Sequence, residues 1–409
     1  MQTPGDARFT GYQLRLFVFL SVATFFEGYD FMALAQLLPN LREHFGLSKT
    51  EGGLVVGVIN AGTVAAYLLV RLADRWGRRR VLTVTIAGYT LFTVATGLAP
   101  DVYTFTAAQL VARVFLIAEW AISMVYAAED FPAARRGMVI GVISGMSSLG
   151  AIVCAGTVSS LIQLPWGWRT VYFVGIIPLL LLAFARRNLA ESSRFTAQVG
   201  LGATGRPLLY IMRSPYRKRV LQLGAIWFVT YICSHNAVTF WKDFAVNERG
   251  FTDGQVSLAV SLAAVGSMPL VFAAGPLIDR IGRRAGAVLI FGLAAVGVLL
   301  SYTLHGQWPL SFALLLGIFG AAGVMPVLNA FTTELFPTEL RGDAFAWSNN
   351  ILGRAGYVVS PLVVASAAEA TSWGAVLSIT AIFPVIAVVM IFAMLPETSS
   401  RELEDTAAL

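Results

Sequence analysis

The hydrophobic positions of this chain form long apolar runs separated by short polar stretches. Six runs in each half are long enough to cross roughly 30 Å of hydrocarbon. They begin near Leu14, Leu54, Val81, Tyr103, Met138, Val171, Val220, Val256, Ala287, Leu310, Ala344 and Trp373. Several runs are marginal in length, but their flanks extend by one turn without burying a charge. The pattern predicts an all-α membrane protein with about twelve transmembrane helices.

Composition supports a bilayer environment and excludes several classes of function. Of 409 residues, 57% are hydrophobic and 13% charged, whereas soluble proteins average about 45 to 50% apolar. Cys154 and Cys233 lie inside apolar runs, and three histidines are scattered along the chain. We therefore expect no metal site, no cofactor and no enzyme active site. The net charge of +6 comes from short arginine clusters, which do not indicate a nucleic-acid partner.

The arginine clusters predict the orientation of the chain in the membrane. Most of the 29 Lys and Arg residues lie in alternate loops and in the stretches outside the runs, which places both termini in the cytoplasm. The longest polar stretch contains Pro207 and Pro215 and is typical of a linker. The predicted organisation is a six-helix bundle over 1–187, a cytoplasmic linker over 188–219, a second six-helix bundle over 220–395 and a cytoplasmic tail over 396–409.

An internal repeat relates the two predicted bundles. The segment Leu72 to Arg79 reappears as Leu277 to Arg284, 205 positions later, and Glu129-Asp-Phe-Pro reappears at Glu334 with the same displacement. Because six spans separate the copies, both halves cross the membrane in the same direction. Parallel repeats of this kind are related by a pseudo-two-fold axis along the membrane normal, and we expect a cavity on that axis.

At these residues the sequence resembles the major facilitator superfamily, and within it the sugar porters and metabolite:proton symporters. The resemblance covers nearly the whole chain and implies the fold of that family and transport by alternating access. It also implies a cytoplasmic gate of carboxylates and arginines, although these charges could instead be topology signals with solvated neighbours. The implied gate residues are Asp74, Arg78, Glu129, Arg136, Glu191, Asp279, Arg283, Glu334, Arg341 and Glu397.

Two acids in the first predicted helix are candidates for proton coupling. Glu27 and Asp30 are three residues apart and share a helix face. Ionisable groups at membrane depth are costly and usually functional, and two close carboxylates in a poorly hydrated site hold a shared proton. Gly28-Tyr29-Asp30 also resembles the Gly-Tyr-Asp of sugar porters, whose Asp couples protons. A purely structural role is the alternative.

The fourth predicted helix adds Arg113 and Glu119. Glu119-Trp120 resembles the Gly-Glu-Trp element of metabolite:proton symporters, in which the helix-four Arg of the family corresponds to Gln109 here. Arg113 stands one turn later, and we infer that it takes over the pairing with Glu27 and Asp30. Glu119 either joins this coupling group or binds a neighbouring helix of its own half.

Polar and aromatic residues in several predicted helices are candidates for substrate binding. Those of the eleventh helix follow helical spacing, and Arg354 among them suits bidentate binding of a carboxylate. The predicted substrate-binding residues are Arg354, Asn350, Trp347, Tyr357, Tyr29, Trp120, Trp227, Tyr231, His235, Asn236 and Asn60. We expect Glu27, Asp30, Arg113 and Arg354 to face one shared pocket between the bundles. His235 could equally be a packing residue.

These features favour a proton-coupled secondary transporter for a small organic solute. Two intramembrane arginines, Arg113 and Arg354, favour an anion such as a carboxylate. The alternatives are a sugar or polyol porter, a drug/proton antiporter, and a non-transporting nutrient receptor on the same fold. The expected partners are a small-molecule substrate, protons and the lipid bilayer, and the expected state is a monomer.

Overall fold

The computed structural model describes residues 9–176, 209–337 and 339–399, and every regular element in these ranges is a helix. In the first half the described residues form five long helices and one short helix. They are α1 (Gly11–Phe45), α2 (Lys49–Trp76), α3 (Arg78–Gly97), α4 (Val102–Asp130), α5 (Ala133–Leu161) and α6 (Arg169–Val174). The Asp101 carboxylate caps α4 by accepting hydrogen bonds from the backbone N–H groups of Tyr103 and Thr104, both 2.9 Å.

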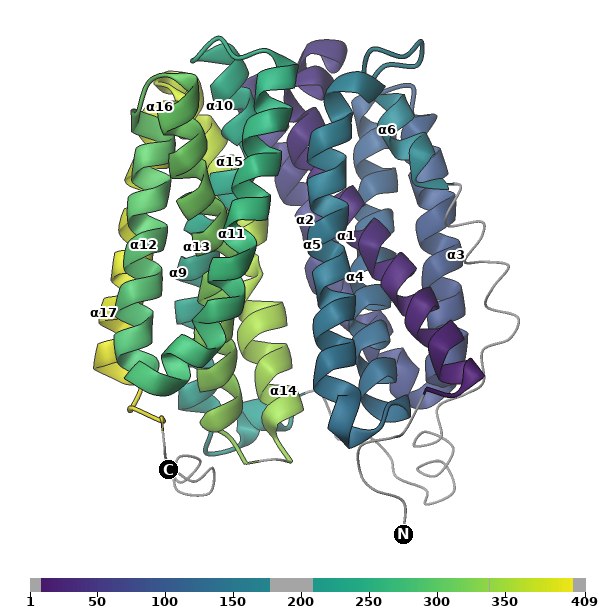
Figure 1. Cartoon of the computed structure of the whole chain (residues 1–409), viewed down its shortest axis with the longest axis vertical. Helices are drawn as coiled ribbons and strands as arrows, with labels where there is room; N and C mark the ends of the chain where they lie inside the picture. Colours follow the sequence, from purple (N-terminus) through teal and green to yellow (C-terminus); the bar gives the residue numbers. More distant parts are fainter. Residues whose placement is uncertain (1–8, 177–208, 338, 400–409) are drawn as a thin grey trace. The chain divides into compact units, whose positions relative to one another are not determined.

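The second half repeats this pattern with three of its spans divided into shorter helices. Its elements are the short turn η2 (Ile211–Arg213), α9 (Arg217–Thr239), α10 (Trp241–Asn247), α11 (Asp253–Ile281), α12 (Arg283–Thr303), α13 (Gln307–Glu334), α14 (Arg341–Phe345), the π-helical turn η3 (Ala346–Gly353), α15 (Ala355–Ala370), α16 (Trp373–Ile379) and α17 (Ile382–Met394). Figure 1 shows α11, α12 and α13 running side by side.

The predicted spans agree with these helices. Each of the twelve predicted starting positions lies inside a helix, and nine helical segments of the described ranges are long and apolar enough to cross a membrane. The other three starts fall in α3, in the short helix α6 and in α9. Thr230, Ser234 and His235 make α9 less apolar than its neighbours. The predicted all-α membrane fold is therefore confirmed.

Contacts between helices divide the chain into two compact units. Unit 1 contains residues 1–32, 65–154 and 169–205, and unit 2 contains residues 33–64, 155–168 and 206–409. Unit 2 therefore includes the end of α1 and the start of α2, which belong to the first half of the sequence. The predicted bundle boundaries stay a prediction, and residues 188–208 of the predicted linker and 400–409 of the tail lie outside the described residues.

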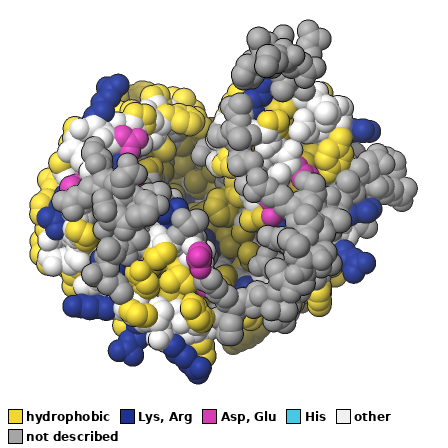
Figure 2. Space-filling view, turned by 90° about the horizontal axis from the view of Figure 1, so that it is seen from below, with side chains coloured by type: hydrophobic (Ala, Val, Ile, Leu, Met, Phe, Trp, Pro, Cys, Tyr) yellow, Lys and Arg dark blue, Asp and Glu magenta, His cyan; other side chains and the backbone are white. Residues whose placement is uncertain are grey.

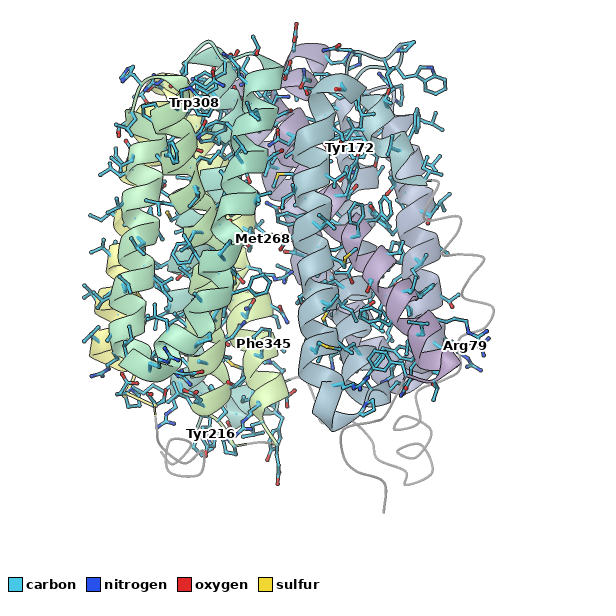
Figure 3. All side chains as sticks on the ribbon, viewed as in Figure 1. Arg79, Tyr172, Tyr216, Met268, Trp308 and Phe345 are labelled. Carbon is cyan, nitrogen blue, oxygen red and sulfur yellow. The ribbon has the colours of Figure 1, made fainter. Side chains whose placement is uncertain are left out.

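Each unit has its own apolar core. In unit 1 the core includes Leu16, Leu82 and Tyr126, all fully buried. In unit 2 it includes Trp227 and Phe331. Figure 3 shows Trp308 and Tyr216 at opposite ends of unit 2, and Trp308 is 59% exposed. Aromatic side chains at helix ends are typical of the membrane–water interface.

The repeated segment forms the same turn in both halves. Gly77 lies between α2 and α3 with a φ of 94°, and Gly282 lies between α11 and α12 with a φ of 95°. These two residues are 205 positions apart. A side chain is strained at such angles, so glycine permits the chain to turn directly from one helix into the next. The turn brings Arg78 and Arg283 to equivalent places at the start of their helices.

Candidate functional site

In unit 1, the two acids of α1 lie where that helix crosses α5. Glu27 is 8% exposed and Asp30 is 3% exposed. The helices approach so closely at Gly28 that a Cβ atom there would lie 1.8 Å from the backbone oxygen of Ser147. The Ser147 hydroxyl donates a hydrogen bond of 2.5 Å to Glu27 Oε2. Close backbone contact with α5 thus positions a hydroxyl group against the first acid.

Asp30 faces two groups from neighbouring helices. The Arg113 guanidinium of α4 interacts electrostatically with its carboxylate, and the Tyr89 side chain of α3 hydrogen-bonds to it. Arg113 is 1% exposed and lies over the Phe31 ring, 4.8 Å from its centroid. Among the described residues, Asp30 Oδ2 and Arg113 Nε and Nη1 have no hydrogen-bond partner. This buried acid and base therefore retain free hydrogen-bonding capacity for a proton, a water or a solute.

Other predicted residues of unit 1 are placed around this group. Glu119 is buried, accepts a 2.7 Å hydrogen bond from Ser123 of its own helix, and interacts electrostatically with Glu27. Tyr29 is buried and donates a 3.2 Å hydrogen bond to the Val171 carbonyl. Trp120 is half-buried. Gln109 donates to the Thr96 hydroxyl at 3.3 Å.

In unit 2, residues of α2, α9 and α15 form a second polar group. Asn60 Nδ2 lies 2.8 Å from His235 Nε2 and donates to the Tyr357 carbonyl at 3.0 Å. The Tyr357 ring contacts the rings of Tyr231 and His235, each with centroids 4.3 Å apart. Asn236 is fully buried and bonds to its own helix at the Ile232 carbonyl.

Trp227 is less exposed than the other aromatic residues of α9. It is fully buried, and its indole donates a 3.2 Å hydrogen bond to Thr332. A Cβ atom at Gly353 would lie 2.6 Å from Trp227 Cβ. Trp227 packs in the core of unit 2, and its role in substrate binding stays a prediction, as do those of Tyr231 and Tyr357.

The π-helical turn η3 changes the face on which the polar residues of this span lie. The Arg354 N–H bonds to the Asn349 carbonyl, 2.9 Å away, in a turn wider than that of an α-helix. As a result Asn349 accepts a 3.1 Å hydrogen bond from the Tyr231 hydroxyl. Trp347 and Asn350 are half-buried. The spacing of a regular helix does not hold across this turn, and Asn349 was missed for that reason.

Arg354 follows the π-helical turn directly. It hydrogen-bonds to the Tyr231 hydroxyl, and among the described residues its buried Nε has no hydrogen-bond partner. Arg354 belongs to unit 2, whereas Glu27, Asp30 and Arg113 belong to unit 1. The shared pocket for these four residues stays a prediction.

The repeated motifs make equivalent ion pairs inside their own halves. Arg78 binds Glu129 at 3.2 Å, and Arg283 binds Glu334 at 2.7 Å. Arg283 also pairs with Asp279, and Arg341 donates to the Phe336 carbonyl at 3.1 Å.

Glu397 caps the start of α12. It accepts hydrogen bonds of 2.9 Å from the backbone N–H groups of Arg283 and Arg284. Burial acts to raise the pKa of Glu397, but these backbone hydrogen bonds outweigh it and lower the pKa. Of the remaining predicted gate residues, Glu191 and the side chains of Asp74 and Arg136 lie outside the described residues.

Sequence reasoning missed a group of charges near the turn between α1 and α2. Arg42 pairs with the fully buried Asp243 at 2.5 Å. Lys242 is 2% exposed, pairs with Asp253 at 2.6 Å and donates to Asn40 at 3.1 Å. All three contacts lie within unit 2, and the bonds Arg42–Asp243 and Lys242–Asn40 join the first half of the sequence to the second. No repeat spacing marks them, so only their apolar surroundings could have drawn attention to them.

Comparisons with known proteins agree with this architecture. The chain matches the model of the Major Facilitator Superfamily over residues 20–252 and 225–408. It is 30% identical over 340 residues to the probable 4-methylmuconolactone transporter of Cupriavidus pinatubonensis, covering 80% of this chain and 77% of that protein. It is 26% identical over 371 residues to the cis,cis-muconate transport protein of Acinetobacter baylyi, covering 88% of each.

A solved structure shares the fold. The D-xylose-proton symporter superposes with a TM-score of 0.76 at 18% identity, over 96% of this chain and 100% of that one. The relatives and the family model describe transporters, not enzymes. The resemblance first read from the repeated motifs is therefore confirmed, and the chain is a multi-pass membrane transporter that belongs to the Major Facilitator Superfamily.

Proposed function

We propose that this transporter carries a small organic anion, such as a carboxylate, in symport with protons. Asp30, with Glu27 beside it, binds the proton, and Arg354 binds the anion. The observation that carries the proposal is the buried pair of Asp30 and Arg113, which interact electrostatically and keep hydrogen-bonding atoms without partners.

The proton part of the proposal follows from the surroundings of Asp30. A carboxylate in a poorly hydrated interior gains from a proton, while a nearby guanidinium favours the charged form. These opposing effects make the charge of Asp30 responsive to its neighbours. When water or a solute alters the contact with Arg113, the carboxyl group takes up or releases its proton.

The anion part rests on Arg354 and on the relatives. Arg354 has an unbonded Nε beside the aromatic rings of Tyr231 and Tyr357. A guanidinium with an aromatic neighbour suits a planar carboxylate. The relatives are named for 4-methylmuconolactone and cis,cis-muconate, and the second of these is a dicarboxylate. Within unit 2, the half-buried Trp347 and Asn350 are further candidates for contact with the anion.

We propose an orientation in which both termini lie in the cytoplasm. We also propose that the protein is a monomer. Figure 2 views the chain from below, and Lys and Arg side chains lie around the margin of this view. A surplus of these residues on one side is typical of the cytoplasmic face. The ion pairs of Arg78 and Arg283 would then lie at the cytoplasmic gate.

The test is uptake into liposomes that contain the purified protein under a pH gradient. We expect accumulation of cis,cis-muconate or 4-methylmuconolactone, up to about tenfold per coupled proton for a gradient of one pH unit. Asp30→Asn should abolish accumulation but preserve exchange of solute without a gradient. Asp101→Asn, at the exposed cap of α4, is the matched acid-to-amide control and should behave as the parent protein.

Three outcomes would overturn parts of the proposal. Full accumulation by both Asp30→Asn and Glu27→Gln would place proton coupling elsewhere. Uptake of xylose but of neither anion would favour a sugar porter. Binding of an anion without any flux would indicate a receptor, and Arg354→Gln should abolish that binding if Arg354 holds the carboxylate.

A further inference from the structure

A hydrogen bond between α2 and α9 joins the first half of the sequence to the second. Asn60 of α2 is 1% exposed and His235 of α9 is 8% exposed. Asn60 Nδ2 and His235 Nε2 are 2.8 Å apart. Both residues belong to unit 2.

A second bond of Asn60 fixes which group donates. The same nitrogen, Nδ2, donates to the Tyr357 backbone carbonyl at 3.0 Å. A carbonyl only accepts, so the amide nitrogen and not the amide oxygen must face it. That nitrogen also faces His235 Nε2, which must therefore accept. His235 is thus neutral in this arrangement, with its hydrogen on Nδ1.

The other neighbours of the ring leave this assignment unchanged. Thr239 Oγ1 lies 3.5 Å from His235 Nε2, but it donates to the His235 carbonyl at 2.9 Å. Titratable side chains near the ring include Tyr357 on α15 and Tyr231 one turn earlier on α9, and Arg354 binds Tyr231.

Protonation of His235 would break the bond to Asn60. A proton on Nε2 would turn that atom into a donor facing another donor, so the attraction becomes repulsion. The Tyr357 ring contacts the imidazole in a T-shaped arrangement, with ring centroids 4.3 Å apart. Of the two charge states of His235, only the neutral one binds Asn60.

The bond lies on a close contact between helices. A Cβ atom at Gly53 would lie 2.5 Å from the Pro361 carbonyl oxygen, and one at Gly57 would lie 2.6 Å from that of Val358. Asn60 is on the next turn of α2 after these two glycines. The backbones of α2 and α15 are thus in close contact at two successive turns of α2. On the following turn, Asn60 continues this contact through its hydrogen bond to α15.

We propose that Asn60 and His235 form a proton-sensitive tie that holds α2 against α9 and α15 when His235 is neutral and releases it when His235 is protonated. The two residues act as positioning residues for coupling, because they convert a proton into a helix movement. The proposal deepens the proposed function and rests on it for its role in transport. The tie itself is measurable without a substrate.

Two spectroscopic measurements on the full-length protein test the tie. The chain has only three histidines, so NMR of ¹⁵N-histidine can follow the Nε2 of His235 across about pH 8 to 5, where histidine side chains commonly change charge. Spin labels at the exposed positions Glu43→Cys and Ala370→Cys report the separation of the α1–α2 turn from the end of α15. The native Cys154 and Cys233 are buried. We expect the distance to lengthen as His235 becomes protonated.

Two variants fix the tie in opposite states. In His235→Gln the side-chain oxygen accepts from Asn60 at every pH, so the short distance should persist. In Asn60→Leu the bond cannot form, so the long distance should appear at every pH. His305→Gln changes an exposed histidine and should keep the response of the parent protein.

The proposal fails if the distance in the parent protein is independent of pH, or if His235→Gln keeps the pH response. Asp30→Asn should retain the response in this assay. A failure of proton coupling at Asp30 is therefore distinguishable from a failure of the tie.

Discussion

Two groups of charged residues differ in which parts of the sequence they join. At the repeated motifs, Arg78 binds Glu129 and Arg283 binds Glu334, each within its own half of the sequence. Near the turn between α1 and α2, Arg42 binds Asp243, and this pair joins one half to the other.

The difference concerns which helices must separate during transport. An ion pair within one half joins helices of the same predicted bundle, so we expect it to stabilise that bundle. We expect a pair between the halves to open when the predicted bundles separate, and rehydration of its charges then offsets the lost attraction. We therefore expect the pairs of Arg78 and Arg283 to stabilise the fold of their own half, and the pair of Arg42 and Asp243 to stabilise one conformation of the transporter.

The largest expected effect is on the stability of the second half. Glu334 accepts hydrogen bonds from Arg283 and Thr398, and its side chain is 16% exposed. Glu334→Gln should lower the free energy of unfolding in detergent by about 1.5 to 3 kcal/mol, without changing the spin-label distance at the α1–α2 turn. For the stability measurement, Glu43→Gln in the unlabelled protein, on an exposed site, is the control. If Glu334→Gln changed the spin-label distance but left the free energy of unfolding unchanged, this pair would control conformation and the comparison would be wrong.

A smaller effect is expected for the charges near the turn between α1 and α2, and it concerns conformation rather than stability. Asp243→Asn removes the partner of Arg42, whereas Asp253→Asn removes a partner of Lys242 within the second half. We expect Asp243→Asn to raise the population with a long spin-label distance by about tenfold, or 1.4 kcal/mol. Asp253→Asn should shift it much less. Equal shifts in both variants would show that joining the halves is irrelevant.

The smallest effect concerns Glu397 and pH. Its pKa is lowered in the folded protein, so its contribution to stability is complete above the ordinary Glu pKa of about 4.3 and is lost as pH falls through the lowered value. Glu397→Gln should lower the melting temperature at neutral pH, and the difference from the parent protein should shrink in acid. A difference that grows in acid would contradict this assignment.

Much of the fold was readable from the sequence because the bilayer imposes a simple rule. Every span needs a long apolar run, and all twelve predicted starts lie in helices. The repeat was equally readable, since Gly77 and Gly282 adopt the same backbone angle at the same displacement.

The contacts of the site were less readable, since they depend on how helices pack. Nothing in the spacing of α1 shows that Ser147 of α5 would meet Glu27 or that Tyr89 would meet Asp30. Asn349 was missed because the π-helical turn changes the face of its helix. Arg42 and Asp243 are 201 positions apart, not 205, so a repeat search cannot pair them.

The crossing of α1 and α5 has a mechanical consequence. A Cβ atom at Gly28 would lie 1.8 Å from the Ser147 oxygen, and one at Gly150 would lie 1.8 Å from the Phe25 oxygen. Close backbone contact at both points opposes sliding of α1 along α5, so we expect the two helices to move together where they cross. The hydrogen bond from Ser147 to Glu27 would then be kept when the two helices move.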